Sequence, residues 1–264
     1  MGTTIKVLVT SLACMCWLLP AHAQTDTAGQ SEHITWAIGA GGMYSPTWLG
    51  SSRTRYDFLP YFAFNWRDIV ELNVTDGLSI DLLRGNAWHG GLIGTWRRGR
   101  SSHDLGDLAK AGVATLSHTL QAGAYLEYVP VKNLTLGVDL SHDIQSTGAA
   151  YGNVYIEWDI PVLKPVEHSL KLNREFMNRS AMRRYFSVPA DPAAALGVQV
   201  YQPSAGASGT RLSYEAFLPT SRSTGFALGL HWTRLASKPA ASPLVRNYGD
   251  KTQRTYLAAF LVHF

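Results

Sequence analysis

The sequence is almost without cysteine, and its two cysteines both stand near its start. Cys14 and Cys16 lie in a segment that we expect to be removed, so the remaining chain would have no disulfide, no thiolate metal ligand and no cysteine nucleophile. Long apolar runs are also missing after residue 23, which excludes a membrane-spanning helix there. If this chain spans a membrane, it must therefore do so as a closed β-barrel.

Strong charge of one sign is a second absence. The formal net charge is only +4 over 264 residues, and no dense basic stretch marks a nucleic-acid surface. Histidines are few, and no pair of them has zinc-ligand spacing with a third donor nearby. We therefore expect no nucleic-acid partner, no metal and no cofactor.

The first 23 residues have the pattern of a secretory signal peptide. Lys6 precedes the apolar run "VLVTSLACMCWLL", and "PAHA" follows it with the small-x-small residues of a cleavage site. We place the cleavage between Ala23 and Gln24. The sequence thus predicts a signal peptide over 1–23 and a single domain over 24–264.

Most of this domain alternates apolar residues with small or polar ones. In "LTLGVDLSHD", for example, Leu136, Val138 and Leu140 share one face of a strand, while Asp139 and Asp143 share the other. The same period of two recurs to the end of the chain. It is typical of a soluble sandwich, or of a barrel whose apolar face meets lipid.

Strand length and aromatic placement favour the barrel. The alternating segments run to about ten residues, as tilted membrane strands do, and tryptophans fall near strand ends, as interfacial girdles require. We expect an all-β, transmembrane, antiparallel up-and-down barrel of about twelve strands, within a range of roughly ten to fourteen. The expected strands are 33–44, 56–66, 69–83, 88–97, 114–129, 133–144, 152–161, 167–174, 196–202, 210–218, 224–236 and 253–264.

The last strand ends on an aromatic residue. Tyr256, Phe260, Val262 and Phe264 share one face of that strand, and such an ending resembles the signal by which bacterial outer-membrane barrels are recognised for assembly. Pairing of the last strand with the first would also remove both exposed edges of the sheet. We therefore expect the protein in the bacterial cell outer membrane, in contact with its lipid and lipopolysaccharide.

Several stretches together resemble the family of MltA-interacting protein (MipA) and OmpV. They are "SPTWLGSSRTRYDFLPYFAF", with Pro46, Trp48, Gly50, Ser51 and Pro60 in the places typical of the family, "LQAGAYLEY", and "LASKPAASPLV", with Ser242 and Pro243. The resemblance covers nearly the whole chain after the signal peptide.

The resemblance implies a barrel without catalytic activity. Its expected function is a scaffold that anchors peptidoglycan-remodelling enzymes, with a lytic transglycosylase and a penicillin-binding protein as partners. A narrow porin-like channel with a preference for cations is the alternative, and a barrel enzyme is a third hypothesis. Against an enzyme, strand alternation sends Ser141 and Asp143 of the "SHD" stretch to one face and His142 to the other.

Charge placement bears on both remaining functions. The face expected to line the lumen carries mainly acidic residues: Glu127, Asp139, Asp143, Glu157, Asp159 and Glu215, with Arg211 as a base among them. Counting strands from Phe264 at the periplasmic side places the long connections 98–113 and 175–195 in the periplasm. Within the second, we expect a docking segment made of Arg179, Arg183, Arg184 and Tyr185.

Overall fold

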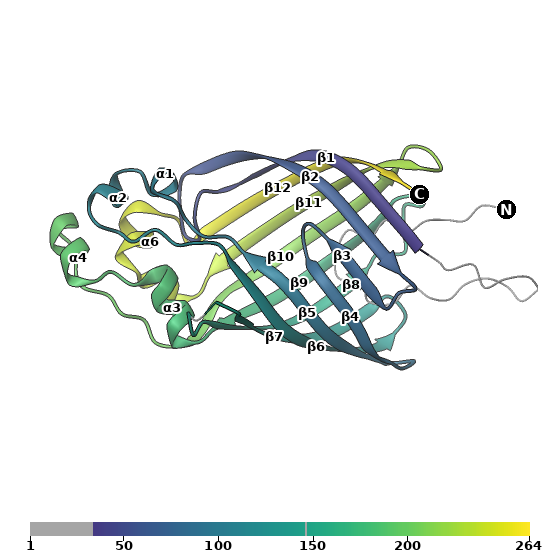
Figure 1. Ribbon diagram of the computed structural model, residues 1–264, viewed down its shortest axis with the longest axis horizontal. Coiled ribbons are helices and arrows are strands. Elements are labelled where there is room, and N and C mark those ends of the chain that lie inside the picture. The colour runs from purple at the N-terminus through teal and green to yellow at the C-terminus, as the bar shows by residue number, and fades with distance from the viewer. Residues whose placement is uncertain (1–33, 146) are drawn as a thin grey trace, which may run out of the picture.

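The computed structural model describes residues 34–145 and 147–264. The signal peptide expected over 1–23, with its cleavage point at Ala23 and Gln24, lies outside the described residues. The described chain forms one closed antiparallel barrel of twelve strands, in which each strand pairs with its sequence neighbours and β12 pairs with β1 (Figure 1). The predicted fold class and strand number are confirmed.

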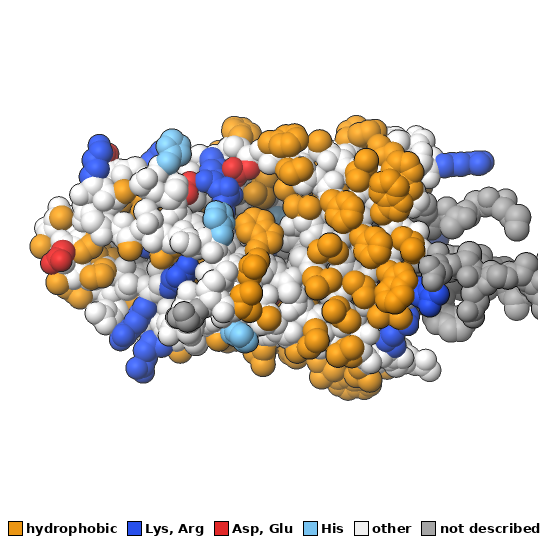
Figure 2. Space-filling view, viewed as in Figure 1, with side chains coloured by type: hydrophobic (Ala, Val, Ile, Leu, Met, Phe, Trp, Pro, Cys, Tyr) orange, Lys and Arg blue, Asp and Glu red, His pale blue; other side chains and the backbone are white. Residues whose placement is uncertain are grey.

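The strands follow the alternation seen in the sequence. Their bounds are β1 (Ile34–Pro46), β2 (Thr54–Trp66), β3 (Val70–Asn73), β4 (Gly77–Arg84), β5 (Trp88–Arg97), β6 (Thr119–Val131), β7 (Leu134–Asp143), β8 (Ala150–Asp159), β9 (Glu167–Met177), β10 (Gly206–Pro219), β11 (Thr224–Leu235) and β12 (Thr252–His263). Apolar side chains on one parity remain exposed on the outer wall, and Figure 2 shows them as a band across the face of the barrel that it draws. Such a band is the surface that meets lipid.

The two ends of the barrel differ. The connections 67–69, 85–87, 132–133, 160–166 and 220–223 are short and lie at the end where β1 begins and β12 ends, which we name the turn end. The connections 47–53, 98–118, 144–149, 178–205 and 236–251 lie at the opposite end, which we name the helical end (Figure 1).

Six short helices occupy the helical end. They are α1 (Ser102–Leu105), α2 (Asp107–Lys110), α3 (Arg179–Phe186), α4 (Ala190–Leu196), α5 (Ser237–Ala241) and α6 (Pro243–Tyr248). None of the helices in the described residues is long and apolar enough to cross a membrane.

Two of the expected strands are wrong, and their errors offset each other in the count. Residues 69–83 form a hairpin of β3 and β4 and not one strand, because Asn73 accepts hydrogen bonds from the main chain of Thr75 and Asp76, and Gly77 has φ +92°. Val70 pairs with Ile80, so the apolar residues have the same parity before and after the turn. Alternation alone therefore could not reveal the reversal.

The expected strand at 196–202 is not part of the sheet. Gly197 ends α4 in the left-handed conformation, and Tyr201 makes only an isolated bridge with Val188. The apolar residues in this stretch pack against the helices, since Val198 and Tyr201 both border a buried cluster there.

These errors reverse the expected direction of the strands between them. The strand at 88–97 is the fifth and not the fourth, so it runs from the turn end to the helical end. The connections 98–113 and 175–195 therefore lie at the end opposite Phe264, and their expected placement beside Phe264 is wrong.

The hairpin of β3 and β4 is much shorter than its neighbours. It pairs with β2 only over Ala63–Trp66, whereas β2 pairs with β1 from Thr54 to Trp66. The part of β2 from Thr54 to Phe62 consequently has a neighbouring strand on one side only. Pro60 lies within this stretch.

Candidate functional site

The strand residues that point into the barrel include the acidic residues expected in the lumen. Glu127, Glu157 and Glu215 are almost fully buried, with 2%, 4% and 6% of their surface exposed, whereas the strand neighbours of Glu127 and Glu157 are exposed on the outer wall. Since buried carboxylates are costly unless hydrogen-bonded or paired, their partners decide what the lumen can do.

One network of such partners crosses the lumen wall from β6 to β9. The Tyr155 hydroxyl donates to a Glu127 carboxylate oxygen, and the Lys171 ammonium lies 3.2 Å from Glu157 Oε2. The same ammonium stands 3.9 Å from the centre of the Tyr155 ring. The Tyr155 ring also covers Gly137, where a Cβ would meet the ring at 2.1 Å, so this glycine makes room for the network.

Two aspartates on β7 also have partners. Asp143 accepts from Thr119, Gln121 and Thr147, and Asp139 accepts from Asn153 at 2.7 Å. Further residues at this face are placed by the same parity. Arg211 lies 2.7 Å from Glu175, Glu215 lies 3.9 Å from His231, and Asp159 ends β8 half-buried at the turn end.

An apolar cluster fills the lumen on one side near the turn end. It consists of Tyr61, Phe217, Ala227, Ala259 and Leu261, all at most 4% exposed. Gly225 lies against the Phe217 ring and Gly39 against Leu261, where a Cβ would clash in each case. Sequence parity indicated that these residues face inward, but the alternation does not show that they meet.

The "SHD" stretch does not assemble a catalytic triad. Ser141 and Asp143 are buried on the inward side of β7, whereas His142 is exposed on the outer wall. In the described residues, no group of three or more histidine, cysteine, aspartate or glutamate side chains could hold a metal ion.

The helical end has a hydrophobic core of its own, which we name the cap. Trp48, Met182, Phe186 and Leu244 are at most 5% exposed in it. The remaining buried members are Leu105, Leu108, Val113, Ala149, Tyr151, Met177, Ala181, Tyr185, Val188, Ala193, Leu235 and Val245. The cap is therefore a packed structure across all the long connections, which the sequence did not predict.

Several of the residues on which the family resemblance rests lie at this cap, namely Trp48, Gly50, Ser51 and Ser242. Gly50 donates its N–H to Gln253 Oε1 at 2.9 Å, and Gln253 Nε2 donates to the Ser51 carbonyl at 3.0 Å. Ser242 donates to the Phe186 carbonyl at 2.8 Å. Gly50 has φ +106°, and a Cβ there would meet Val245 at 2.7 Å, so this position requires glycine.

The expected docking segment forms α3 at the helical end. Tyr185 is buried in the cap, and Arg184 is half-buried with Nη2 donating to the Ser117 carbonyl at 2.9 Å. Arg179 and Arg183 are exposed. Half of this segment therefore holds the cap together, and only its two outer arginines are presented to solvent.

Two charged groups organise the connection between β5 and β6. Burial lowers the pKa of Arg100 to about 10, and its guanidinium donates to the carbonyls of Ala114 and Tyr185 at 3.0 and 2.8 Å. Asp104 closes a capping box with Ser101 at the start of α1 and pairs with Arg55. Burial raises the pKa of Asp104, but the hydrogen bonds from Ser101 and the Arg55 charge outweigh it and hold that pKa below its usual value.

The expected assembly signal lies on the outer wall of β12. Tyr256, Phe260 and Phe264 are each 42–50% exposed, and Val262 shares their parity. The Phe264 ring stacks on Trp36 with centroids 4.3 Å apart, and the Phe264 N–H donates to the Trp36 carbonyl at 2.9 Å. The terminal residue thus closes the seam between β12 and β1.

No curated protein matches the chain. Among solved structures, the NanC porin is 7% identical over 87% of this chain and 98% of its own, with a TM-score of 0.39. OprD from Pseudomonas aeruginosa is 10% identical over 86% of this chain and 59% of its own, with a TM-score of 0.35.

A family model gives the stronger result. The model of MltA-interacting protein MipA matches residues 38–264, which include all the strands except the first residues of β1. The match covers the barrel together with the cap. The chain therefore belongs to the MipA family.

Proposed function

We propose that this barrel is a non-catalytic anchor in the bacterial outer membrane that holds peptidoglycan-remodelling enzymes at the periplasmic face. Short turns on the periplasmic side and long connections outside are the rule for such barrels. The turn end would then face the cell wall, and the cap would face the exterior. The docking surface must accordingly be sought at the turn end.

The observation that carries the proposal is a ring of basic residues at that end. Each of the five short connections has one exposed basic residue in it or next to it, and Figure 2 shows basic side chains projecting at this end. These residues, which we name the basic ring, are Arg67, Arg84, Lys132, Lys164 and Arg222. Exposed Asp68 and half-buried Asp159 and Glu167 lie in or next to the same connections, so the five bases leave an excess of positive charge at this end. Such an excess attracts partners of the opposite charge.

The chemistry of the ring suits an acidic protein surface or the anionic polymer of the cell wall. A lytic transglycosylase fits the name of the family, and a penicillin-binding protein is the second partner that the resemblance implies. The hydrogen-bonded lumen carboxylates and the separated "SHD" side chains support a role without catalysis.

The test replaces the five residues of the basic ring by glutamine in one variant. We expect the amount of lytic transglycosylase that co-purifies from solubilised envelopes to fall by about tenfold, since several surface charges act together. Added salt should weaken the wild-type complex in the same way.

A matched control removes five exposed charges from the helical end. It replaces Lys110, Arg179, Arg183, Arg246 and Lys251 by glutamine and should leave co-purification unchanged. Equal loss of co-purification in both variants, or no loss in either of them, would contradict docking at the turn end. Heat-modifiable migration of both variants shows that the barrel is folded.

A narrow cation-preferring channel is the second candidate. It is supported by the excess of carboxylates on the inward face, where Lys171 and Arg211 are the bases closest to them. The apolar cluster around Phe217 and Leu261 supports the anchor instead, because it occupies lumen space near the turn end.

A further inference from the structure

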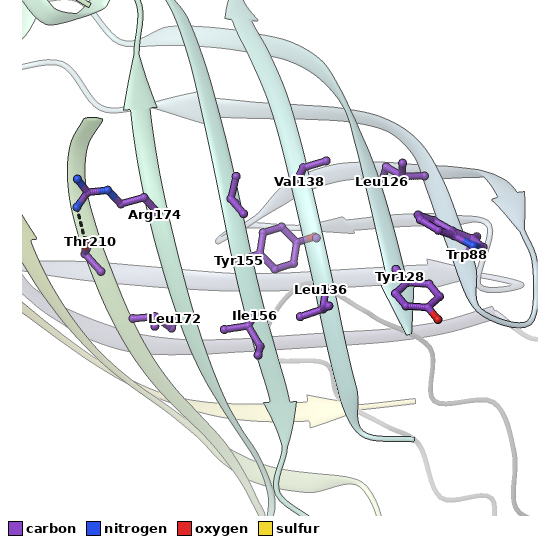
Figure 3. A pocket seen from close by; sticks show the side chains of 12 residues that line it. Trp88, Leu126, Tyr128, Leu136, Val138, Tyr155, Ile156, Leu172, Arg174 and Thr210 are labelled. Carbon is purple, nitrogen blue, oxygen red and sulfur yellow. Dashed lines mark hydrogen bonds between the residues drawn. The ribbon is translucent and has the colours of Figure 1, made fainter. Parts of the chain in front are cut away.

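The outer wall of the barrel bears a concave groove across β5 to β10. Its volume is about 670 Å³, and Figure 3 shows the side chains along it. Most of them are apolar and stand on the outward parity. They are Trp88, Leu126, Tyr128, Leu136, Val138, Val154, Ile156 and Leu172, with Arg174 and Thr210 at one end.

Strand register arranges these side chains in two parallel rows. The first row runs across neighbouring strands through Trp88, Tyr128, Leu136, Ile156 and Leu172. The second row runs beside it through Leu126, Val138, Val154, Arg174 and Thr210. From β5 to β9 is four strand spacings, or about 19 Å, so the groove between the rows is long and narrow.

Both rows continue to arginines beyond the groove. The second row continues from Thr210 to Arg234 and Thr252, and the first continues through Trp232 to Arg254. Arg174 and Arg234 are two strand spacings apart, about 10 Å. Arg234 and Arg254 are diagonal neighbours at roughly 7–8 Å. Arg174 donates to Thr210 Oγ1 at 2.6 Å, as Figure 3 shows.

These three arginines are unusual in their direction. Among the Asp, Glu, Lys and Arg residues of strands β6 to β12, these three are the ones whose side chains point outward. Every Asp and Glu of those strands points inward. An outward arginine costs about 2–4 kcal/mol at the bilayer centre and ~0–1 near its surface. The three should therefore lie at the level of lipid head groups.

Their position along the barrel agrees with this. Arg234 and Arg254 lie within two residues of the helical end of β11 and β12, whereas Tyr128 lies near the turn end of β6. Both rows therefore run from the apolar band towards the helical end, where they reach the edge of the cap. Trp232 and Tyr256, both about half exposed, stand beside the arginines as interfacial aromatics do.

We propose that this surface binds a membrane lipid that carries acyl chains and a phosphate group. The acyl chain lies in the groove between the two rows. The phosphate is held by Arg174, Arg234 and Arg254, with the hydroxyls of Thr210 and Thr252 between them. Guanidinium groups donate paired, charge-assisted hydrogen bonds to phosphate, which makes arginine suited to this role.

A lipid fits better than a free anion because the site has two parts. Free phosphate could engage the arginines but would leave the apolar groove without an occupant. The proposal is independent of the anchor function, since the site lies on the outer wall near the helical end and the basic ring lies at the turn end.

The test uses the purified full barrel in nonionic detergent and native mass spectrometry. Dioleoyl phosphatidic acid is the probe, and dioleoyl phosphatidylcholine has the same chains with a neutral head group. We expect the protein to retain phosphatidic acid at least about fivefold better. Replacing Arg174, Arg234 and Arg254 by glutamine should abolish this preference.

Two further variants keep the test decisive. A control that replaces Lys132, Lys164 and Arg222 by glutamine removes the same charge from the turn end and should keep the preference. Val138→Trp with Val154→Trp fills the groove on the lipid-facing wall and should lower retention of both lipids. Heat-modifiable migration checks the fold of each variant.

Three outcomes would overturn the proposal. The first is equal retention of the two lipids by the wild type. The second is equal loss in the arginine variant and its turn-end control. The third is full competition by inorganic phosphate at the same concentration as phosphatidic acid, which would show an anion site without a lipid chain.

Discussion

At the scale of single residues, the cap depends on a few buried polar groups. Arg100 is 4% exposed and joins the segment at Ala114 to the end of α3 through two carbonyls. Asp104 joins the start of α1 to Arg55 on β2. An unsatisfied buried polar group costs about 1–3 kcal/mol. Loss of either side chain would leave such groups in the cap and would destabilise it.

The pKa of Asp104 predicts how the cap responds to acid. A carboxyl whose pKa is lower in the folded state stabilises that state above its unfolded pKa, and this stabilisation is lost as the pH falls through the folded pKa. We therefore expect amide hydrogen exchange in α3, corrected for the intrinsic pH dependence of exchange, to be faster near pH 3 than near pH 6.

The Asp104→Asn variant isolates this effect. It keeps the shape of the side chain but loses the ion pair with Arg55, so the corrected exchange should already be fast near pH 6 and should change little with acid. A wild type with the same corrected exchange rate at both pH values would show that Asp104 does not hold the cap.

At the scale of elements, the last strand determines whether the barrel closes. β12 pairs with β1 from Tyr44 to Ala37, and Phe264 extends the seam by one stacked ring on Trp36. A charge at this point would be desolvated next to the lipid-facing band and would remove the stacking.

We predict that Phe264→Asp blocks insertion while export across the inner membrane continues. Folded, heat-modifiable protein in the outer-membrane fraction should fall at least about tenfold, since a carboxylate in an apolar contact is costly. Phe264→Tyr preserves the ring and should insert normally. Wild-type levels of the aspartate variant would mean that the terminal aromatic is incidental.

The elements also show what could be predicted from the sequence. Alternation located most strands because the wall has lipid on one side and a packed lumen on the other, so the period of two is physically enforced. It failed at 69–83 because a tight turn at Asn73 preserved the parity. It failed at 196–202 because Val198 and Tyr201, which have opposite parity, both pack against the core of the cap, while Val200 is 54% exposed.

The cap itself could not be read from local pattern. Its helices are four to eight residues long, too short for a helical period to stand out. Its core joins Trp48 to Leu244 across almost the whole chain, which no local rule detects. The cluster of outward arginines could not be predicted either, because Arg174, Arg234 and Arg254 become neighbours only through strand register.

At the scale of the whole molecule, the contents of the lumen decide between an anchor and a channel. Inward carboxylates favour cations, but the cluster around Phe217 and Leu261 occupies space near the turn end. We therefore predict very low single-channel conductance for the wild type in planar bilayers.

Phe217→Ala with Leu261→Ala should widen the lumen and raise a cation-selective current. Neutralising Asp139, Glu157 and Asp159 in that background should reduce the preference for cations, and substitution of the outward Leu140 by Ala serves as a control. A large wild-type current would favour the channel over the anchor, and an anion preference would remove the channel hypothesis.

The short hairpin of β3 and β4 has a consequence for the wall itself. The Phe62 carbonyl accepts from Val74, so the even-numbered residues of β2 direct their main-chain groups to that side, and above the hairpin tip no described strand faces them. Tyr56 and Phe58 are 84% and 76% exposed there. Main-chain amides cannot stay bare in hydrocarbon, so we expect water to reach these groups along this seam. Pro60 has no N–H, and it stands where that N–H would have pointed into the seam.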